Sequence, residues 1–475
     1  MPDGTEGSGV GARVPRREDD RYMRGRGRYI GDIKLAGMKE VAFLRSPFAH
    51  GRIRGFDIPD VLRAQVTVAA DMAGVKNIRA VTALPGFKVS EQPALATDKV
   101  RYVGELVAMC LAPDRARAED IVQRVSVDIE ELPAIHDMVR ARDADAPLIH
   151  EQWDENSFLE SVVDDPKFDE IAAKAPIKIT RTFQTARQCM SPIEGRGVVA
   201  EWDSRLEQLI VYSASQMPHI VRTGLSECLG LDHGKVRIIA PDVGGGFGYK
   251  GILLPEEVAI CWLAMQVRHP VRWIEDRREQ LSANANCREH HYVVTAHAEE
   301  SGKLVALEAT AHVDSGAYSA YPFSACLEAA QVGSILPGPY DFEAFRCRTW
   351  SSCTNKPPIL PYRGVARTGV CFAMELMLDA IAREVGKEPH EIRQMILVPP
   401  EVMPFDNITA KHFDSGDYPE CLRRAVDAID LPAVRARQAA GEADGRLVGV
   451  GLSIFCEQGS HGTSVYSGWG IPMVP

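Results

Sequence analysis

Apolar and polar residues alternate, or β-branched residues cluster, in several short segments of the first 150 residues. Such segments predict strands, and a nearly continuous apolar run is typical of a strand that is buried on both faces. Strands are expected at 40–45, 66–70, 103–111 and 125–129. A helix is expected from Pro113, because proline suits a first helical turn. This mixture predicts an α+β domain over residues 21–147, after a flexible arm at residues 1–20.

The pattern changes after residue 147. Residues 148–176 are polar and acidic, and we expect them to form a linker over the surface. Residues 177–475 form a second, larger region with strands and helices. Strands are expected at 198–202, 209–213 and 236–240, and helices at 218–229, 255–269 and 370–385. The last helix has an i, i+3, i+4, i+7, i+8 apolar face and ends at Gly386, a favoured C-terminal cap.

Composition and charge narrow the class of protein. The 475 residues carry 54 Lys and Arg against 65 Asp and Glu, a net charge of −11. The acidic balance argues against a nucleic-acid-binding protein, and no segment has the ~18 apolar residues that a membrane span needs. The first 17 residues lack the apolar core of a secretory signal, so we expect a cytoplasmic protein. The eleven cysteines form no C-x-x-C pair, which favours buried thiols over a zinc or iron–sulfur site.

A glycine-rich segment, 241–250, directly follows the strand expected at 236–240. Its four glycines in five positions allow left-handed backbone conformations and a close approach of backbone N–H groups to a ligand, and they lose conformational entropy on folding. The spacing excludes a Walker loop, because no Ser or Thr follows Lys250, and it does not match G-x-G-x-x-G. A tight structural turn remains an alternative.

Two further segments contain candidate ligand-binding side chains. Gln216 lies after an expected strand. Its amide can face a ligand, and the alternative is that this segment is an ordinary turn. His219 has no second ligand at metal-binding spacing. In the proline-rich segment 355–367, Arg363 lies beside Gly364 near the start of a helix, and this arrangement suits an anionic or polar group.

These segments, taken together and in order, resemble the molybdopterin-binding large subunit of the xanthine oxidase and aldehyde oxidase family, which includes aerobic carbon monoxide dehydrogenase. The resemblance extends from about residue 20 to the last residue. It rests on segments 25–32, 44–50, 99–105, 131–134, 191–194, 216, 244–248, 314–318 and 362–364. It implies an α/β-hammerhead domain followed by the first part of the molybdenum-cofactor-binding domain.

The resemblance also implies a cofactor and site residues. A molybdenum-pyranopterin, either molybdopterin or its cytosine dinucleotide, would hydroxylate a heteroaromatic or aldehyde-type carbon with oxygen from water, and the protein would orient the reactants. Gln216 would hydrogen-bond an oxo group on molybdenum, and no direct protein ligand to the metal is expected. The other implied residues are Gly245, Gly246, Phe247, Gly248, Arg363 and Gly364 at the cofactor and Val365 in the substrate pocket. Electrons would pass to [2Fe-2S] clusters and FAD, carried by an iron–sulfur subunit and an FAD subunit.

Three positions differ from well-known branches of the family. Gly364 occupies the position of a copper-binding Cys in the carbon monoxide enzymes, so copper chemistry is not expected. Gly251 follows Lys250 where xanthine-type enzymes have a Glu. Val365 replaces a Phe that stacks on substrate in those enzymes. We therefore expect a substrate pocket that differs in shape from a xanthine pocket.

The family's large subunit is longer than this chain, and its later part carries the glutamate that acts as general base. We therefore expect a second polypeptide to supply that residue, with the isolated chain inactive. The alternative is a truncated, inactive chain that only binds partner subunits. A third interpretation, a dehydrogenase whose glycine-rich loop holds a nucleotide, is disfavoured by the glycine spacing.

No glutamate of this chain is assigned as the catalytic base. A surface pair with Arg196 is the expectation for Glu194. Glu375 is expected within a helix, and Glu457 at the end of a strand.

Overall fold

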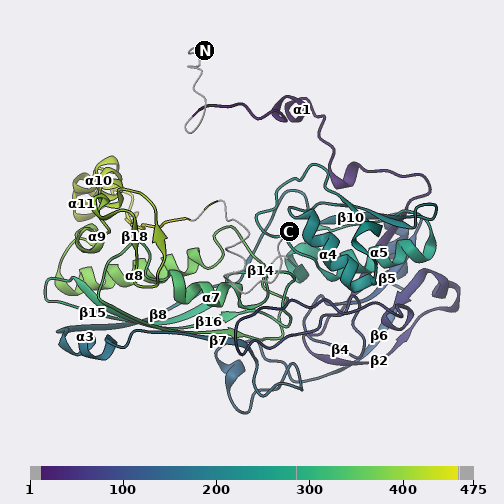
Figure 1. Ribbon diagram of the computed structural model, residues 1–475, viewed down its shortest axis with the longest axis horizontal. Coiled ribbons are helices and arrows are strands. Elements are labelled where there is room, and N and C mark those ends of the chain that lie inside the picture. Colours follow the sequence, from purple (N-terminus) through teal and green to yellow (C-terminus); the bar gives the residue numbers. More distant parts are fainter. Residues whose placement is uncertain (1–11, 285, 458, 460–475) are drawn as a thin grey trace.

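The structure, a computed structural model, describes residues 12–284, 286–457 and 459, and it has two lobes that are each built on a β-sheet (Figure 1). The first lobe contains a seven-stranded sheet in the order β12-β11-β10-β13-β1-β5-β3. Its strands are β1 (Lys39–Arg45), β3 (Val66–Val68), β5 (Leu106–Ala112), β10 (Gly197–Asp203), β11 (Gln208–Ser213), β12 (Val236–Ile239) and β13 (Val271–Ile274). One sheet therefore combines strands from both predicted regions, 21–147 and 177–475.

Helices cover both faces of this sheet. Successive residues of a strand point to opposite faces, so neighbouring residues of β1 pack against different helices. On one face, Val41 and Phe43 of β1 pack in one cluster with α4 (Pro218–Leu229) and α5 (Pro255–Val267). On the other face, Ala42 packs with Ala118 of α2 (Arg115–Val122). Both α4 and α5 begin at a proline, and α4 ends at Gly230 in the left-handed conformation. The predicted helices 218–229 and 255–269 are confirmed to within two residues.

A small sheet in the order β4-β2-β6 also belongs to the N-terminal region. Its strands are β2 (Gly51–Asp57), β4 (Lys99–Val100) and β6 (Ser126–Glu131). The sequence predicts β6 but not β2, whose sequence GRIRGFD contains two glycines that interrupt the alternation. Ile53 and Phe56 nevertheless pack against Val127 and Ile129 of β6, and this pairing holds β2 in place.

The second lobe contains a five-stranded sheet in the order β7-β17-β16-β15-β8. Its strands are β7 (Ser157–Asp164), β8 (Ile177–Thr185), β15 (His290–Ala298), β16 (Leu304–Asp314) and β17 (Ala344–Ser352). The helices α7 (Cys326–Ile335) and α8 (Arg367–Val385) cover one face, and α3 (Phe168–Lys174) lies on the other (Figure 1). The predicted helix 370–385 is therefore confirmed, and Gly386 caps it in the left-handed conformation.

The linker predicted at 148–176 is wrong. This segment contains β7, which pairs antiparallel with β17 over its whole length, and α3, which packs on Ala306 and Ala344 through Phe168. Its many acidic residues occupy exposed positions, whereas Phe158 and Leu159 are buried in the sheet. A strand with one solvated face therefore has the composition of a loop.

The remaining elements are short. Three helices follow α8, namely α9 (Pro389–Ile396), α10 (Tyr418–Ala428) and α11 (Leu431–Ala440). Two small sheets pair β9 (Gln188–Cys189) with β14 (Asn286–Cys287) and β18 (Phe405–Asp406) with β19 (His412–Phe413). The two other α-helices within the described residues, α1 (Asp19–Met23) and α6 (Arg277–Glu279), are short. Among the helices that the structure describes, none is long and apolar enough to cross a membrane.

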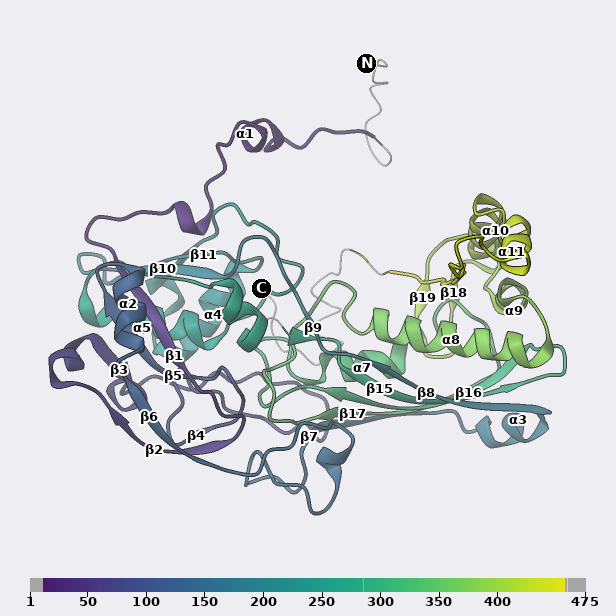
Figure 2. The same ribbon diagram turned by 180° about the vertical axis from the view of Figure 1, so that it is seen from behind.

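The arm predicted at residues 1–20 falls partly outside the described residues. From residue 12 the chain is irregular until α1, which projects from the first lobe in both views (Figures 1 and 2). Met23 of α1 is 86% exposed, in keeping with this projecting position.

Candidate functional site

Three loops that lie far apart in the sequence meet where the two lobes join. They follow β11 (residues 214–217), β12 (residues 240–254) and β17 (residues 353–366). Met217, Tyr249, Tyr362 and Val365, which come from these three loops, pack in a single apolar cluster. The structure thus brings together the segments that hold all of the predicted site residues.

Gln216 is bound to the glycine-rich loop through its own side chain. Its amide oxygen Oε1 accepts a hydrogen bond from the Gly248 N–H at 2.9 Å, and its backbone N–H donates to the Lys250 carbonyl at 2.8 Å. A Cβ atom on Gly246 would lie 2.4 Å from Oε1, so only glycine allows this approach. The bond uses the amide oxygen and leaves the NH2 group of this exposed side chain as the donor that it can offer to a ligand.

Phe247 lies at the tip of the glycine-rich loop in a left-handed conformation, with φ of +58°. Its ring is 43% exposed, and its carbonyl accepts a hydrogen bond from the Arg363 N–H at 2.9 Å. A non-glycine residue in this region stores about 1–3 kcal/mol of strain, which the surrounding contacts must hold. The surrounding contacts therefore fix the position of the Phe247 backbone, from which the side chain extends to the surface.

The loop before α8 is equally constrained. Val365 has φ of +49°, and its N–H donates to the Tyr362 carbonyl at 2.5 Å. The Arg288 guanidinium donates to the Arg363 carbonyl and lies 4.2 Å above the Tyr362 ring. Gly364 has φ of +94°, and a Cβ atom there would lie 3.4 Å from the Arg288 guanidinium. The side chain of Arg363 is exposed at the site.

The surface pair predicted between Glu194 and Arg196 is wrong. Glu194 is 15% exposed and pairs instead with the buried Lys250, at 2.7 Å, within the glycine-rich segment. Burial lowers the pKa of Lys250, and the Glu194 carboxylate opposes that change. Arg196 is buried and binds Glu256 and Glu257 at the start of α5. These carboxylates are some 60 positions away along the chain, so no local pattern could reveal the pairing.

Glu375 and Glu457 also have structural partners. Glu375 lies in α8, as expected, where it accepts hydrogen bonds from Tyr340 and from Arg393. Glu457 pairs with Arg367 at 3.4 Å, but it lies in an irregular segment and not at the end of a strand as predicted.

No metal centre can be assigned to protein side chains within the described ranges, since no three His, Cys, Asp or Glu residues gather there at ligand distance. The eleven cysteines are free thiols, of which Cys421 and Cys456 are exposed. Burial raises the pKa of Cys110, Cys228 and Cys287 to about 12, so these thiols stay protonated near neutral pH.

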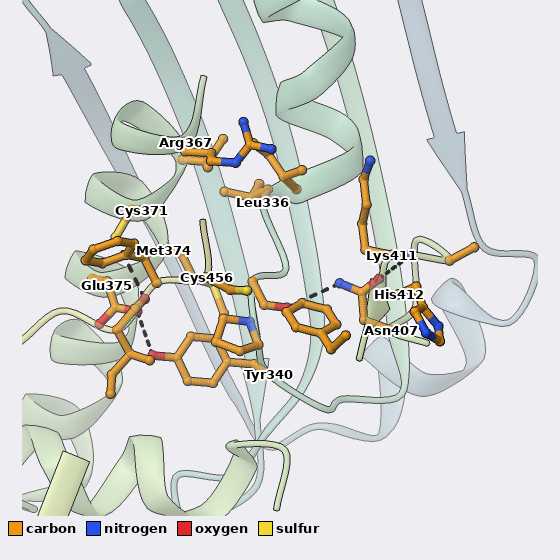
Figure 3. Close-up of a pocket in the computed structure, with 18 residues that line it drawn as sticks. Leu336, Tyr340, Arg367, Cys371, Met374, Glu375, Asn407, Lys411, His412 and Cys456 are labelled. Carbon is orange, nitrogen blue, oxygen red and sulfur yellow. Dashed lines mark hydrogen bonds between the residues drawn. The ribbon is translucent and has the colours of Figure 1, made fainter. Parts of the chain in front are cut away.

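A cavity of about 470 Å³ lies beside α8 in the second lobe, and its lining includes Arg367, which directly follows the loop 353–366 (Figure 3). Its walls are largely apolar, and the hydrogen-bonded side chains of Tyr340 and Glu375 lie at one side. Lys411 lies at its edge without an ion-pair partner among the described residues, and desolvation lowers its pKa. Sequence reasoning missed this cavity because its lining comes from segments spread over residues 335–456 that carry no shared motif.

Family models match both parts of the chain. Residues 149–397 match the molybdopterin cofactor-binding domain. Residues 24–133 match the a/b hammerhead domain of aldehyde oxidase and xanthine dehydrogenase.

Individual relatives agree with these matches. The chain is 31% identical to the nicotine 6-hydroxylase large subunit of Paenarthrobacter nicotinovorans, over 97% of this chain and 57% of that protein. It is 32% identical to the carbon monoxide dehydrogenase large chain of Hydrogenophaga pseudoflava, over 95% of this chain and 58% of that protein. The structure of quinoline 2-oxidoreductase from Pseudomonas putida 86 superposes with a TM-score of 0.91 at 36% identity, and the match covers 97% of this chain and 59% of that one. The chain thus spans less than two thirds of the length of these relatives.

Proposed function

The chain belongs to the family of molybdopterin-binding large subunits that includes the xanthine dehydrogenases, aldehyde oxidases and carbon monoxide dehydrogenases, and we propose that it serves the hydroxylation of a ring carbon in an N-heteroaromatic compound. Water is the proposed source of the oxygen. The observation that carries the choice of substrate class is the likeness to two proteins whose names refer to nicotine and quinoline, which both contain a pyridine ring. An aldehyde is the second candidate, because the family also contains aldehyde oxidoreductases.

The loop before α8 supports a hydroxylase over a copper-containing carbon monoxide dehydrogenase. The Sγ atom that would bind copper is absent at Gly364, whose φ of +94° is unfavourable for any other residue. A cysteine there would have to adopt this left-handed conformation beside the Arg288 guanidinium. The proposal therefore does not include copper.

The residues present fit a molybdenum-pyranopterin. A Cβ atom at Gly246 or Gly248 would collide with Gln216 or with Pro361, so the glycines let the loop pack closely on these neighbours. This packing leaves the exposed side chains of Gln216 and Phe247 available to a ligand. We propose that the NH2 group of Gln216 donates to an oxo group and that the Phe247 ring covers the metal–dithiolene end. Arg363 and Gly364 are proposed to line the cofactor, and Val365 to line the substrate pocket. When bound, the cofactor supplies the redox chemistry, and the protein supplies orientation and electrostatics.

Partner subunits complete the proposal. The proposed partners are an iron–sulfur subunit with [2Fe-2S] clusters and an FAD subunit, which would accept the electrons. The general base is proposed to come from the part of the relatives that this chain does not match, since Glu194 is already engaged by Lys250 and Gly244. We infer that the chain is inactive without that part.

The cavity beside α8 is a proposed contact surface for the part of the relatives that this chain does not match. Residues 454–456 form part of its lining, and Cys371 of α8 contacts Ser453 and Ile454. The Lys411 ammonium, which has no ion-pair partner within residues 12–284 and 286–457, would suit a carboxylate from the bound segment, and the apolar walls would suit apolar side chains.

Purification of the native complex tests the proposed function. We expect molybdenum and a pterin in about equimolar amounts with the chain, and oxidation of quinoline- or pyridine-type substrates with an artificial electron acceptor. A complex that contains no molybdenum would contradict the family-level role. A loaded complex that oxidises aldehydes but no N-heteroaromatic compound would contradict the substrate class alone.

Gln216→Ala tests the role of the amide in the same complex. The loss of one hydrogen bond to a charged or strongly polar group corresponds to about 1.5–3 kcal/mol, so kcat/KM should fall about ten- to hundredfold. Gln208→Ala is the control, because Gln208 lies at the start of β11 and bonds the Gly234 carbonyl instead. Equal activity of the two variants would contradict the assignment of Gln216.

A further inference from the structure

Residues 21–30, which comprise the end of α1 and the segment that joins it to the first lobe, lie against both ends of the glycine-rich loop. One set of contacts ends on Asp242, which precedes the glycines, and the other ends on Glu194, which binds Gly244 and Lys250. Because α1 projects from the lobe in both views, these contacts connect an exposed element to the candidate site (Figures 1 and 2).

Asp242 receives a dense set of hydrogen bonds from this segment. The Arg21 guanidinium donates to both of its carboxylate oxygens, and the Tyr22 hydroxyl donates to Oδ1 at 2.9 Å. The Arg28 N–H donates to Oδ2 at 2.7 Å, and the Asp242 N–H donates to the Arg28 carbonyl at 3.0 Å. The bond from Arg21 is the largest cause that lowers the pKa of Asp242 well below its usual range. A bidentate, charge-assisted pair of this kind fixes geometry as well as adding stability.

Glu194 links the same segment to the other part of the loop. Its Oε1 accepts a hydrogen bond from the Ile30 N–H at 3.2 Å. Its Oε2 accepts from the Gly244 N–H and from the Lys250 ammonium, both at 2.7 Å. A Cβ atom on Gly244 would lie 2.5 Å from the Cβ of Glu194, so the backbone there is in direct contact with this side chain.

The loop needs such external contacts because its own sequence does not determine its shape. Gly244, Gly245, Gly246 and Gly248 have wide conformational freedom in an isolated chain. Gly245 and Gly248 adopt positive φ, which glycine populates readily, and Phe247 between them adopts positive φ as well. For Phe247 this conformation is rarely populated, and it persists only where the surrounding structure imposes it.

We propose that residues 21–30 form a brace that holds the glycine-rich loop in its binding conformation, with Arg21, Asp242 and Glu194 as positioning residues. The brace acts through Asp242 at the start of the loop and through Glu194 at Gly244 and Lys250. The effect of the brace on the conformation of the loop is independent of the proposed function. Its effect on how much cofactor the protein retains rests on the proposed function.

Hydrogen exchange of the full chain, purified with whatever subunits accompany it, tests the brace directly. The readout is the exchange rate of backbone amides in a peptide that covers residues 243–250, compared with peptides from β10 and α5. Arg21→Gln and Asp242→Asn should each raise the rate in the loop at least tenfold and leave β10 and α5 unchanged. Arg21→Lys, which keeps the charge but not the bidentate geometry, should give an intermediate rate.

A matched control lies directly after the same helix. Arg24, the residue after α1, pairs with Asp20 of α1, and both side chains are exposed, so Arg24→Gln should leave the loop unchanged. Tyr22→Phe removes a single hydroxyl and serves as a milder second variant in case Asp242→Asn does not fold. Unchanged exchange in the loop of both Arg21→Gln and Tyr22→Phe would overturn the proposal.

The molybdenum and pterin content of the same samples separates this proposal from the proposed function. If the wild-type protein holds the cofactor, Arg21→Gln should retain at most half of the wild-type cofactor content, and Arg24→Gln should retain all of it. If wild-type protein holds no cofactor but Arg21→Gln still loosens the loop, the brace is supported and the proposed function fails. If the cofactor is present and Arg21→Gln changes neither loop exchange nor content, the brace is overturned and the proposed function is untouched.

Discussion

Gly248 shows how little space the site leaves at individual residues. Its φ is +102°, and a Cβ atom would lie 2.3 Å from the Pro361 carbonyl oxygen, in the loop before α8. The absence of a side chain is therefore what lets the loops after β12 and β17 touch. The sequence identifies the glycines as unusual, but their contact partner can be found only in three dimensions.

Gly248→Ala should separate these two loops. The backbone contact must open and the left-handed conformation becomes strained, so we expect a loss of about 1–3 kcal/mol in local stability and of most bound cofactor. Gly234→Ala is the control, because a Cβ atom there has no neighbour within 4 Å. Molybdenum content and thermal unfolding of both variants check the prediction, and equal content would contradict it.

Glu105 is a buried carboxyl whose ionisation should affect stability. It is 3% exposed, accepts a hydrogen bond from the Tyr318 hydroxyl at 2.9 Å, and burial raises its pKa from 4.5 to about 7. The folded state therefore binds the proton more tightly than the unfolded state does. Its contribution is fully present below pH 4.5 and is lost as the pH rises to about 7.

Glu105→Gln should remove that pH dependence. The free energy of unfolding of the wild-type protein should fall between pH 5 and pH 7.5 by about 2–3 kcal/mol more than that of the variant. Urea titrations at the two pH values measure the difference. Glu91→Gln, at an exposed ion pair with Arg79, should behave like the wild-type protein. Parallel pH profiles for Glu105→Gln and the wild-type protein would refute the assignment.

Helices with clear boundary residues could be predicted from the sequence, whereas the acidic edge strand β7 could not. Pro218 and Gly230 define α4, and Gly386 defines the end of α8, because these residues act locally. In contrast, the sequence of β7 predicts a linker, since acidic residues surround the buried Phe158 and Leu159. The order of strands in the two sheets has no local signal at all.

The contact between α8 and α9 depends on a buried ion pair. Arg393 of α9 is 0% exposed and binds Glu375 of α8 at 2.7 Å. Arg393→Ala leaves a buried carboxylate without its partner, so we expect a loss of about 3–5 kcal/mol in unfolding free energy. Arg383→Ala, at an exposed position of the same α8, should change stability by less than about 0.5 kcal/mol. Denaturant midpoints of the two variants provide the comparison.

At the scale of the whole molecule, the two matched domains share one sheet. β1 pairs with β13 in parallel, and Arg45 at the end of β1 binds Glu256 of α5. Asn355, in the loop before α8, donates to the Arg101 carbonyl. The resemblance to the family could be recognised from ordered motifs, but motifs are local and do not report that the domains interlock.

Limited proteolysis should reveal this interlocking. The segment 143–147 lies between the two matched domains and contains exposed residues, so a protease can cleave there. We expect both fragments to elute together in gel filtration and to separate only in denaturant. Fragments that part under native conditions would show that the shared sheet contributes little to their association.

The uneven exposure of the thiols has a practical consequence. Because the pKa values of Cys110, Cys228 and Cys287 are raised to about 12, an alkylating dye at pH 8 should label Cys421 and Cys456 far faster than these residues. Cys456 borders the cavity beside α8, whereas Cys421 lies on α10. Because Cys189 and Cys371 are also partly exposed, a Cys189→Ser/Cys371→Ser/Cys421→Ser variant would carry one environment-sensitive fluorophore at the edge of that cavity. The emission of this fluorophore would report in real time when a polypeptide segment binds there.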